Sequence, residues 1–165
     1  MSEIHVTGLA ELQKFLDELP AKIERNIMRG ALRAGMNQIK PVAQANARKV
    51  SGLLADGLKV GTRSRNGVVY ATLRTTGKHG FVARWLEFGT RPHTITGKNR
   101  KSLSFGGGLF QSVEHPGARP YPFLRPALDR QAQAAVIAAA EYIKERLATK
   151  QGLDTSAVLI EGDEP

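Results

Sequence analysis

The sequence predicts an α+β fold, in which N-terminal helices and a long C-terminal helix pack on a small antiparallel sheet, with a long extended central loop. Three observations predict it. Apolar residues recur at helical spacing before residue 48 and again from 122 to 150. Between these blocks the pattern alternates around an Asn-Gly pair, as in a hairpin. Residues 90–120 are rich in glycine and basic side chains and follow neither period.

Two helices are expected at the N-terminus. The first covers residues 8–19, with Thr7 as its N-cap and Pro20 at its end. The second covers residues 21–48. An interior proline costs a helix about 3 kcal/mol, so we expect a bend or a break near Pro41.

An antiparallel hairpin is expected next. Residues 57–62 and 68–73 alternate in polarity, and Asn66-Gly67 between them both tolerate a positive φ. The expected outward positions are Lys59, Thr62, Arg63 and Arg74.

A short helix over residues 81–88 would place Val82, Trp85 and Leu86 on one face. Gly89 then stands at the C′ position, which favours left-handed geometry. We interpret Trp85 as an anchor in the hydrophobic core.

The last helix is expected over residues 122–150, with Pro122 in its first turn and Gln151-Gly152 at its end. Phe123 begins a broad apolar face that is rich in alanine, which predicts close packing.

The central loop, residues 90–120, is longer than most connections in a compact domain. Short strands at 94–96, 103–105 and 109–113 would convert it into a second hairpin. The glycine-rich residues 105–108 are interpreted as a flexible tip, because they lack the lysine and hydroxyl pattern of a phosphate loop.

The composition bounds the possible functions. The chain has 165 residues, consistent with one domain, and a net charge of +9, which favours anionic partners. It contains no cysteine, and no apolar run approaches the roughly 20 residues that cross a bilayer, so neither a disulfide nor a membrane partner is expected. The basic residues crowd the middle of the chain, whereas the last fifteen residues are acidic.

No catalytic, metal or cofactor site is predicted. The four histidines have no zinc-binding pattern, and no second acid lies near Glu87. We therefore interpret Glu87 as a structural residue that accepts hydrogen bonds, with Arg84 or Arg91 as donors. No cofactor is expected.

A nucleic-acid-binding protein remains open as an alternative. Basic and aromatic side chains are mixed in the middle of the chain, where phosphate neutralisation could combine with base stacking. These residues are Arg84, Trp85, Arg91, Arg100, Phe105 and Phe110.

Several motifs together resemble a known family. Seven stretches, in their order along the chain, resemble the tail-component (neck, tail-completion or head–tail joining) proteins of lambdoid long-tailed phages. They are Gly8-Leu9-Ala10-Glu11-Leu12, Leu19-Pro20, Arg29-Gly30-Ala31-Leu32, Ser51-Gly52-Leu53-Leu54, residues 81–90, His115-Pro116-Gly117 and residues 122–128. The sequence departs from the family pattern at Lys49, where proline is usual, and at Ser51, which replaces threonine.

The resemblance implies an α+β protomer of a homo-oligomeric ring at the head–tail junction, without catalysis. Its implied partners are the neighbouring connector and tail-tube or tail-terminator proteins, with genomic DNA passing through the lumen. It implies location in the virion, and in the host cytoplasm during assembly. The resemblance covers roughly residues 8–150, so we expect residues 1–150 to form the tail-component domain; residues 151–165, which it does not cover, are expected to be an acidic tail.

The resemblance also implies roles for residues. Glu87 to Thr90 would set the turn into the central loop, His115 to Gly117 would return the chain, and Phe123 with Leu124 would anchor the last helix. The implied structural motif comprises Trp85, Glu87, Phe88, Gly89, Thr90, His115, Pro116, Gly117, Pro122, Phe123, Leu124 and Pro126. The central loop itself is expected to be an interaction loop that faces either the DNA passage or an acidic neighbouring ring; its residues are Arg91, Lys98, Arg100, Lys101, Phe105 and Phe110.

Overall fold

The structure is a computed structural model that describes residues 8–48, 52–77, 80–97, 102–156 and 158–160. The chain divides into two compact units, each described by itself below. Unit 1 comprises Met1–Gly80 and Phe123–Pro165, and unit 2 comprises Phe81–Pro122. Helices and small antiparallel sheets make up the described residues, which confirms the α+β class.

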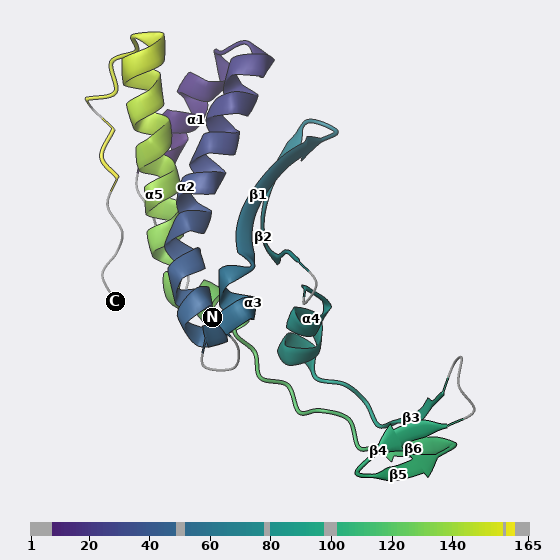
Figure 1. The fold of residues 1–165 in the computed structure, drawn as a ribbon. Helices are drawn as coiled ribbons and strands as arrows, with labels where there is room; N and C mark the ends of the chain where they lie inside the picture. The colour runs from purple at the N-terminus through teal and green to yellow at the C-terminus, as the bar shows by residue number, and fades with distance from the viewer. Residues whose placement is uncertain (1–7, 49–51, 78–79, 98–101, 157, 161–165) are drawn as a thin grey trace. The chain divides into compact units, whose positions relative to one another are not determined.

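Unit 1 is built on two long helices. Helix α2 (Ala21–Arg48) and helix α5 (Arg125–Gln151) run antiparallel, side by side (Figure 1). Helix α1 (Leu9–Asp17) packs on them. The core that these three helices share is made of Leu12, Leu16, Ile27, Ala31, Ala140, Ile143 and Leu147, with Val158 from the C-terminal segment.

Close approach of α2 and α5 depends on Gly35. A Cβ built on this residue would lie 2.6 Å from the carbonyl oxygen of Ala135 on α5. Only a residue without a side chain fits there, because real Cβ atoms do not approach backbone oxygen so closely. The alanine-rich face of α5 therefore packs closely, as its composition predicts.

Helix α2 continues through Pro41, so the break expected as one of two outcomes is wrong, and the bend stays a prediction. Proline removes one backbone hydrogen bond from the helix interior. Ile39, Ala43 and Ala47 flank it at helical spacing, and all three are buried. Their packing holds the helix together across the missing bond.

The ends of α1 and α5 differ in detail from the prediction. Gly8, with φ 80°, is the N-cap of α1, and Thr7 lies outside the described residues. Helix α5 begins at Arg125, so Pro126 rather than Pro122 occupies its first turn. Its C-cap is Gly152 with φ 67°, where the sequence predicts the end.

The predicted hairpin is confirmed and belongs to unit 1. Helix α3 (Gly52–Asp56) leads into strand β1 (Leu58–Arg65), which pairs antiparallel with β2 (Val68–Thr75). Asn66 and Gly67 have φ values of 52° and 79° and form the turn. Thr62 does not lie on the outward face. Because side chains alternate along a strand, Thr62 and Arg63 point to opposite faces of the hairpin, and the Thr62 hydroxyl accepts a hydrogen bond from Arg33 of α2.

The C-terminal segment after Gly152 packs on its own chain. Thr155 and Val158 are buried, and the Lys144 ammonium of α5 donates to the carbonyl of Val158. Hydrogen bonds from the Ser156 side chain and from its backbone N–H lower the pKa of the Asp154 carboxyl.

Unit 2 replaces the predicted extended loop with two nested hairpins. After helix α4 (Gly80–Phe88), strand β3 (His93–Thr96) pairs with β6 (Ser112–His115), and β4 (Leu103–Phe105) pairs with β5 (Gly108–Phe110) between them. Gly106 and Gly107, both at positive φ, form the inner turn. Residues 105–108, interpreted as a flexible tip, are therefore strand ends and a turn.

None of the helices in the described part of the chain has the length and hydropathy that a membrane crossing requires.

Candidate interaction surfaces

The two most distinctive sequence motifs meet in unit 2. Thr90 and Ala118 form an isolated antiparallel bridge: Thr90 N donates to Ala118 O over 2.9 Å, and Ala118 N donates to Thr90 O over 3.1 Å. Ala118 N also lies 2.9 Å from the Thr90 hydroxyl oxygen, which accepts from it. We call Gly89, Thr90, Gly117 and Ala118 the clasp, since they close the base of the nested hairpins.

Both glycines of the clasp are required by geometry. Gly89 has φ 70° and Gly117 has φ 84°, a region that side chains disfavour. A Cβ on Gly89 would lie 2.6 Å from Ala118 O, and one on Gly117 would lie 2.3 Å from Thr90 O. Each glycine thus makes room for the backbone of the opposite strand of the clasp.

The two histidines beside the clasp support the same turn. The His93 and His115 rings lie 5.0 Å apart between centroids, tilted by 30°, across the β3–β6 pair. His115 Nδ1 accepts a hydrogen bond from Gly117 N over 3.0 Å, and His93 Nδ1 lies 2.9 Å from Arg91 O. These contacts order backbone, and Pro116 between them is exposed.

Helix α4 presents an aromatic face to solvent. Phe81, Trp85 and Phe88 follow one another at helical spacing and are 55%, 51% and 64% exposed. The Phe81 and Trp85 rings pack edge to face, with centroids 4.9 Å apart. The prediction that Trp85 is a core anchor is therefore wrong, because α4 buries Ala83 and Glu87 instead.

Glu87 is 4% exposed, the most deeply buried acid of the described residues. Beside it, a hollow of about 550 Å³ is lined by Arg84, Trp85, Phe88, Gly89, Thr90, Arg91, Ala118 and Pro120. Two guanidinium groups and two aromatic rings meet there with the clasp. The prediction that Arg84 or Arg91 donates to Glu87 remains a prediction.

The residues of the predicted interaction loop lie apart. Arg91 is exposed beside the clasp, and Phe110, on β5, is 45% exposed. The backbone of Phe105 ends β4. Lys98, Arg100 and Lys101 lie outside the described residues.

The last motif straddles the boundary between the units. Pro122 ends unit 2 and is exposed, whereas Phe123 is buried in unit 1, where its carbonyl accepts a hydrogen bond from Asn46 of α2. Leu124 is the N-cap residue of α5 and is half-buried, and Pro126 follows in the first turn.

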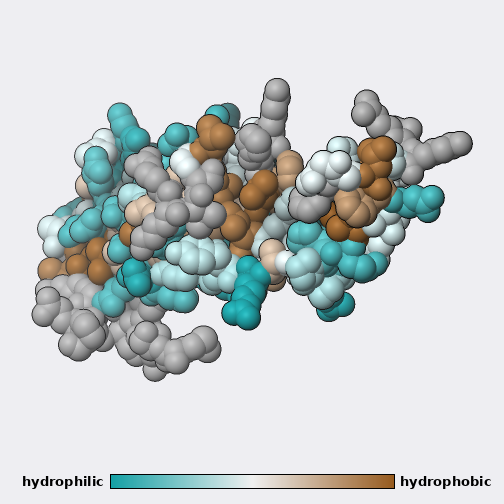
Figure 2. All heavy atoms as spheres, turned by 60° about the horizontal axis from the view of Figure 1, so that its bottom comes forward, coloured by the Kyte–Doolittle hydropathy of each residue, from teal (hydrophilic) through white to brown (hydrophobic). Residues whose placement is uncertain are grey.

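Unit 1 has an apolar groove that sequence reasoning missed. About 550 Å³ in volume, it lies between α2, α5 and β2. Its walls include Leu32 and Met36 of α2, Val69 of β2, and Leu128 and Val136 of α5. Figure 2 shows hydrophobic side chains exposed among polar ones on the molecular surface. The available signal was the run Ala134 to Ala140 of α5, which is apolar around the whole helix.

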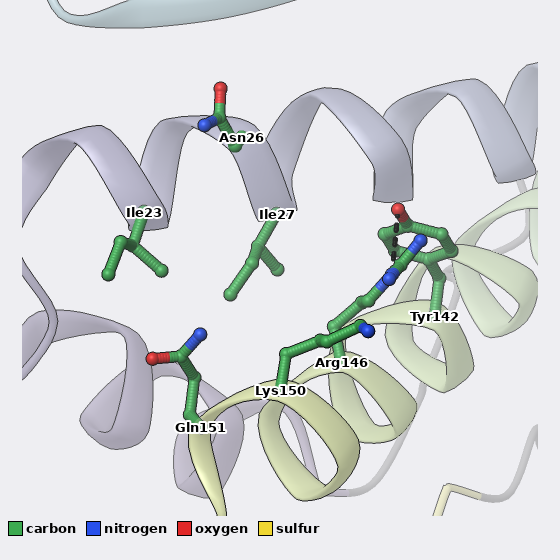
Figure 3. A pocket seen from close by; sticks show the side chains of 7 residues that line it. All are labelled: Ile23, Asn26, Ile27, Tyr142, Arg146, Lys150 and Gln151. Atoms are coloured by element: carbon green, nitrogen blue, oxygen red, sulfur yellow. Dashed lines mark hydrogen bonds between the residues drawn. The ribbon is translucent and has the colours of Figure 1, made fainter.

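A second hollow lies at the other end of the α2–α5 pair. Figure 3 shows Ile23 and Ile27 of α2 facing Tyr142, Arg146 and other polar side chains of α5. Arg146 Nε donates to the Tyr142 hydroxyl over 3.1 Å. Its volume is about 280 Å³, and its lining contains no carboxylate and no histidine.

Within the described residues, no group of three or more histidine, cysteine, aspartate or glutamate side chains could hold a metal ion. The described residues do present exposed apolar and basic surfaces, which are typical of association with a partner.

The comparisons with known proteins agree with this picture. Residues 10–89 match the family model described as HK97-gp10-like, "Bacteriophage HK97-gp10, putative tail-component". No curated protein matches the chain. No solved structure matches it either.

The match includes α4, Glu87 and Gly89 and ends before residues 115–128, whose resemblance remains a prediction. It supports a structural role in the phage tail. Through residues 10–89 the chain is similar to a phage tail-component family.

Proposed function

We propose that this tail component works in the neck of the virion, where it assembles into a ring that completes the tail or joins it to the head. The observation that carries the proposal is the exposed aromatic face of α4, formed by Phe81, Trp85 and Phe88. Large exposed apolar patches mark surfaces that another protein covers. The role is structural, without catalysis, and the host cytoplasm is the place of assembly.

The presence of two different apolar surfaces on one chain supports a ring. The α4 face belongs to unit 2, and the groove between α2, α5 and β2 belongs to unit 1. Contact between unlike patches of neighbouring copies is heterologous, and heterologous contacts whose rotation closes generate rings. The same surfaces would seat the ring on the connector and on the tail-tube or tail-terminator protein, with the genome passing through its lumen.

The size of the α4 face predicts when the ring forms. Fully buried aromatic side chains cover about 150–250 Å² each, so three that are about half exposed offer roughly 300 Å². A stable interface needs about 800 Å² per partner. We therefore expect a weakly associating protomer that closes into a ring when a neighbouring connector or tail protein adds further contact area.

The chain carries its own reporter for this assembly. Trp85 is its single tryptophan and lies in the α4 face. Native mass spectrometry of the protein, alone and mixed with connector and tail proteins, should yield a cyclic oligomer with its partners. The fluorescence of Trp85 should shift to shorter wavelength on assembly, because the indole side chain is then no longer exposed to water.

Two variants sharpen the test. Phe88→Ala removes part of the α4 face while keeping the reporter, and should reduce the cyclic oligomer. Leu53→Ala is the matched control, since Leu53 on α3 is 70% exposed and lies outside both apolar surfaces. A chain that stays monomeric with all its partners, with unchanged Trp85 emission, would contradict the proposal.

The alternative function is that of a basic nucleic-acid-binding protein. It is favoured by the net charge of +9 and by the arginines that flank the α4 aromatics, Arg84 and Arg91. Tight, salt-sensitive DNA binding by a monomer that ignores connector and tail proteins would support it over the ring.

A further inference from the structure

Every charged side chain of the β1–β2 hairpin is basic. From Leu58 to Thr75 the sequence contains four basic side chains, Lys59, Arg63, Arg65 and Arg74, and no aspartate or glutamate. A two-stranded hairpin of marginal stability has no structural need for four like charges. The charge therefore points to a partner.

The strand register places all four cations on one face. Lys59 lies opposite Arg74, Arg63 opposite Tyr70, and Arg65 opposite Val68. Since side chains alternate along a strand, these positions share the side on which all six residues are exposed. The other side carries Leu58 and the half-buried Val60, and turns toward α2.

One cross-strand pair on this face opposes folding. Like charges directly opposite each other destabilise an antiparallel pair, and Lys59 and Arg74 are such a pair. Arg63 is held differently, with its guanidinium 5.7 Å from the centre of the Tyr70 ring. An anion bound between Lys59 and Arg74 would convert their repulsion into two attractive contacts.

The face also has a recess between its cations. Gly61 lies opposite Thr72 between the two charged pairs, and the resulting hollow, of about 460 Å³, is lined by Gly61, Thr62, Arg63, Thr72, Leu73 and Arg74. A Cβ on Gly61 would lie 3.9 Å from Arg74 Nε. Two guanidinium groups and the Thr72 hydroxyl thus border a recess into which an oxyanion such as phosphate can enter.

The cations repeat as a polyanion would require. Alternate residues of a strand are about 6.7 Å apart, so Arg63 and Arg65 continue the row that Lys59 begins. On α2, Arg25, Arg29 and Arg33 are exposed at intervals of one helical turn, about 6 Å apart. Arg33 reaches Thr62 of β1, which joins this row to the edge of the hairpin.

We propose that the outer face of the β1–β2 hairpin binds the sugar-phosphate backbone of duplex DNA independently of sequence. A two-stranded ribbon fits the major groove of DNA, and regularly spaced cations match its regularly spaced phosphates. The face has no asparagine or glutamine outside the turn to read adenine, and the spacing of its cations along the strands suits phosphates, so we expect its affinity to come from phosphate contacts. A Cβ added to Gly67 would meet no atom within 4 Å, and Figure 1 shows the turn between β1 and β2 apart from α2.

The proposal does not depend on ring formation. Binding to DNA by the free protein tests it, whereas assembly with connector and tail proteins tests the neck role. Failure of one leaves the other standing.

The experiment is fluorescence anisotropy of a short labelled duplex titrated with the full-length protein at 50 to 200 mM salt. Four phosphate contacts predict a slope of about −3.6 for log affinity against log salt, or a loss of about 150-fold across this range. The double variant Arg63→Ala/Arg74→Ala should halve the slope and reduce the loss to about 12-fold. A duplex of unrelated sequence should bind equally.

The matched control is Arg130→Ala/Lys150→Ala, which removes the same charge from exposed positions of α5. It should keep the wild-type slope. The single variant Arg74→Ala separates binding from folding: its melting temperature should hold or rise, since the repulsion from Lys59 is relieved, while its DNA affinity falls. Arg63→Lys/Arg74→Lys should keep the slope.

Three results would overturn the proposal. The first is the absence of DNA binding at 50 mM salt. The second is an equal salt slope for the hairpin double variant and the α5 double variant. The third is that an acidic peptide binds the wild-type hairpin more tightly than DNA does and displaces the DNA.

Discussion

Replacing Gly117 by alanine tests the clasp most directly. At this position the backbone has φ 84°, and a Cβ would lie 2.3 Å from Thr90 O and 2.9 Å from the carbonyl carbon of Arg91. The atoms it meets are backbone, which cannot rotate aside as a flexible side chain does. The substitution should therefore push the two strands of the clasp apart.

The magnitude can be built from its parts. A non-glycine residue in left-handed geometry costs about 1–2 kcal/mol. Overpacking that displaces backbone costs about 1–3 kcal/mol more, and opening the Thr90–Ala118 bridge forfeits hydrogen bonds worth about 1 kcal/mol each. These effects overlap, so we expect a local loss of about 3–5 kcal/mol.

Gly107→Ala is the matched control. Gly107 has nearly the same φ, 82°, but nothing within 4 Å of its added Cβ. It should lose only the conformational part, about 1–2 kcal/mol. The difference between the two variants, about 2–3 kcal/mol, isolates the contact of Gly117 with the opposite backbone.

Hydrogen exchange with mass spectrometry on peptides from unit 2 measures this difference. Protection of the Thr90 and Ala118 amides should fall roughly 30- to 150-fold further in Gly117→Ala than in Gly107→Ala, since about 1.4 kcal/mol is tenfold. Peptides of α2 and α5 should exchange as in the wild type, because they belong to unit 1. Equal loss of protection in the two variants would refute the reasoning, since it would leave only the conformational cost.

Three further predictions follow from the fold. Gly35→Ala should lower the free energy of unfolding by about 1–2 kcal/mol in chemical denaturation, because the clash with Ala135 O at 2.6 Å exceeds the gain of about 1 kcal/mol in helix propensity; Gly52→Ala, in open space, should cause no loss. Trp85→Ala should lower it by only about 1 kcal/mol, since the ring is half exposed; a loss of 3–5 kcal/mol would restore its role in the core. Replacing residues 97–111, which include β4 and β5, with a two-residue turn should keep the β3–β6 pairing, seen as a wild-type circular dichroism spectrum. The variant should fail to complement a phage that lacks the protein. Normal phage yield would show that the β4–β5 hairpin is not needed for assembly.

Local chemistry explains which elements could be predicted. The Asn66-Gly67 turn and the C-cap at Gly152 depend on a few neighbouring residues and on φ values that asparagine and glycine tolerate. Helix α4 and Gly89 after it follow the same logic, since the aromatic spacing and the glycine lie within nine residues. These elements are present where they were expected.

Errors arose where distant residues decide the outcome. The break at Pro41 was expected from the intrinsic cost of proline, but buried Ile39 and Ala43 hold the helix together. Trp85 was assigned to the core on hydrophobicity alone, although the packing of α4 buries Ala83 and Glu87. Periodicity reports that a helix has an apolar face without reporting which face is covered.

The fold class, the first hairpin, the long helices and the resemblance to a phage tail component could be predicted from the amino-acid sequence, because each depends on spacing within one segment. The three-dimensional pairing was needed to show that Gly89-Thr90 meets Gly117-Ala118, which strands of the central loop pair with each other, and that four cations of β1 and β2 share one face. These features depend on pairing between residues far apart in the chain, where loop closure and backbone fit matter more than local propensity.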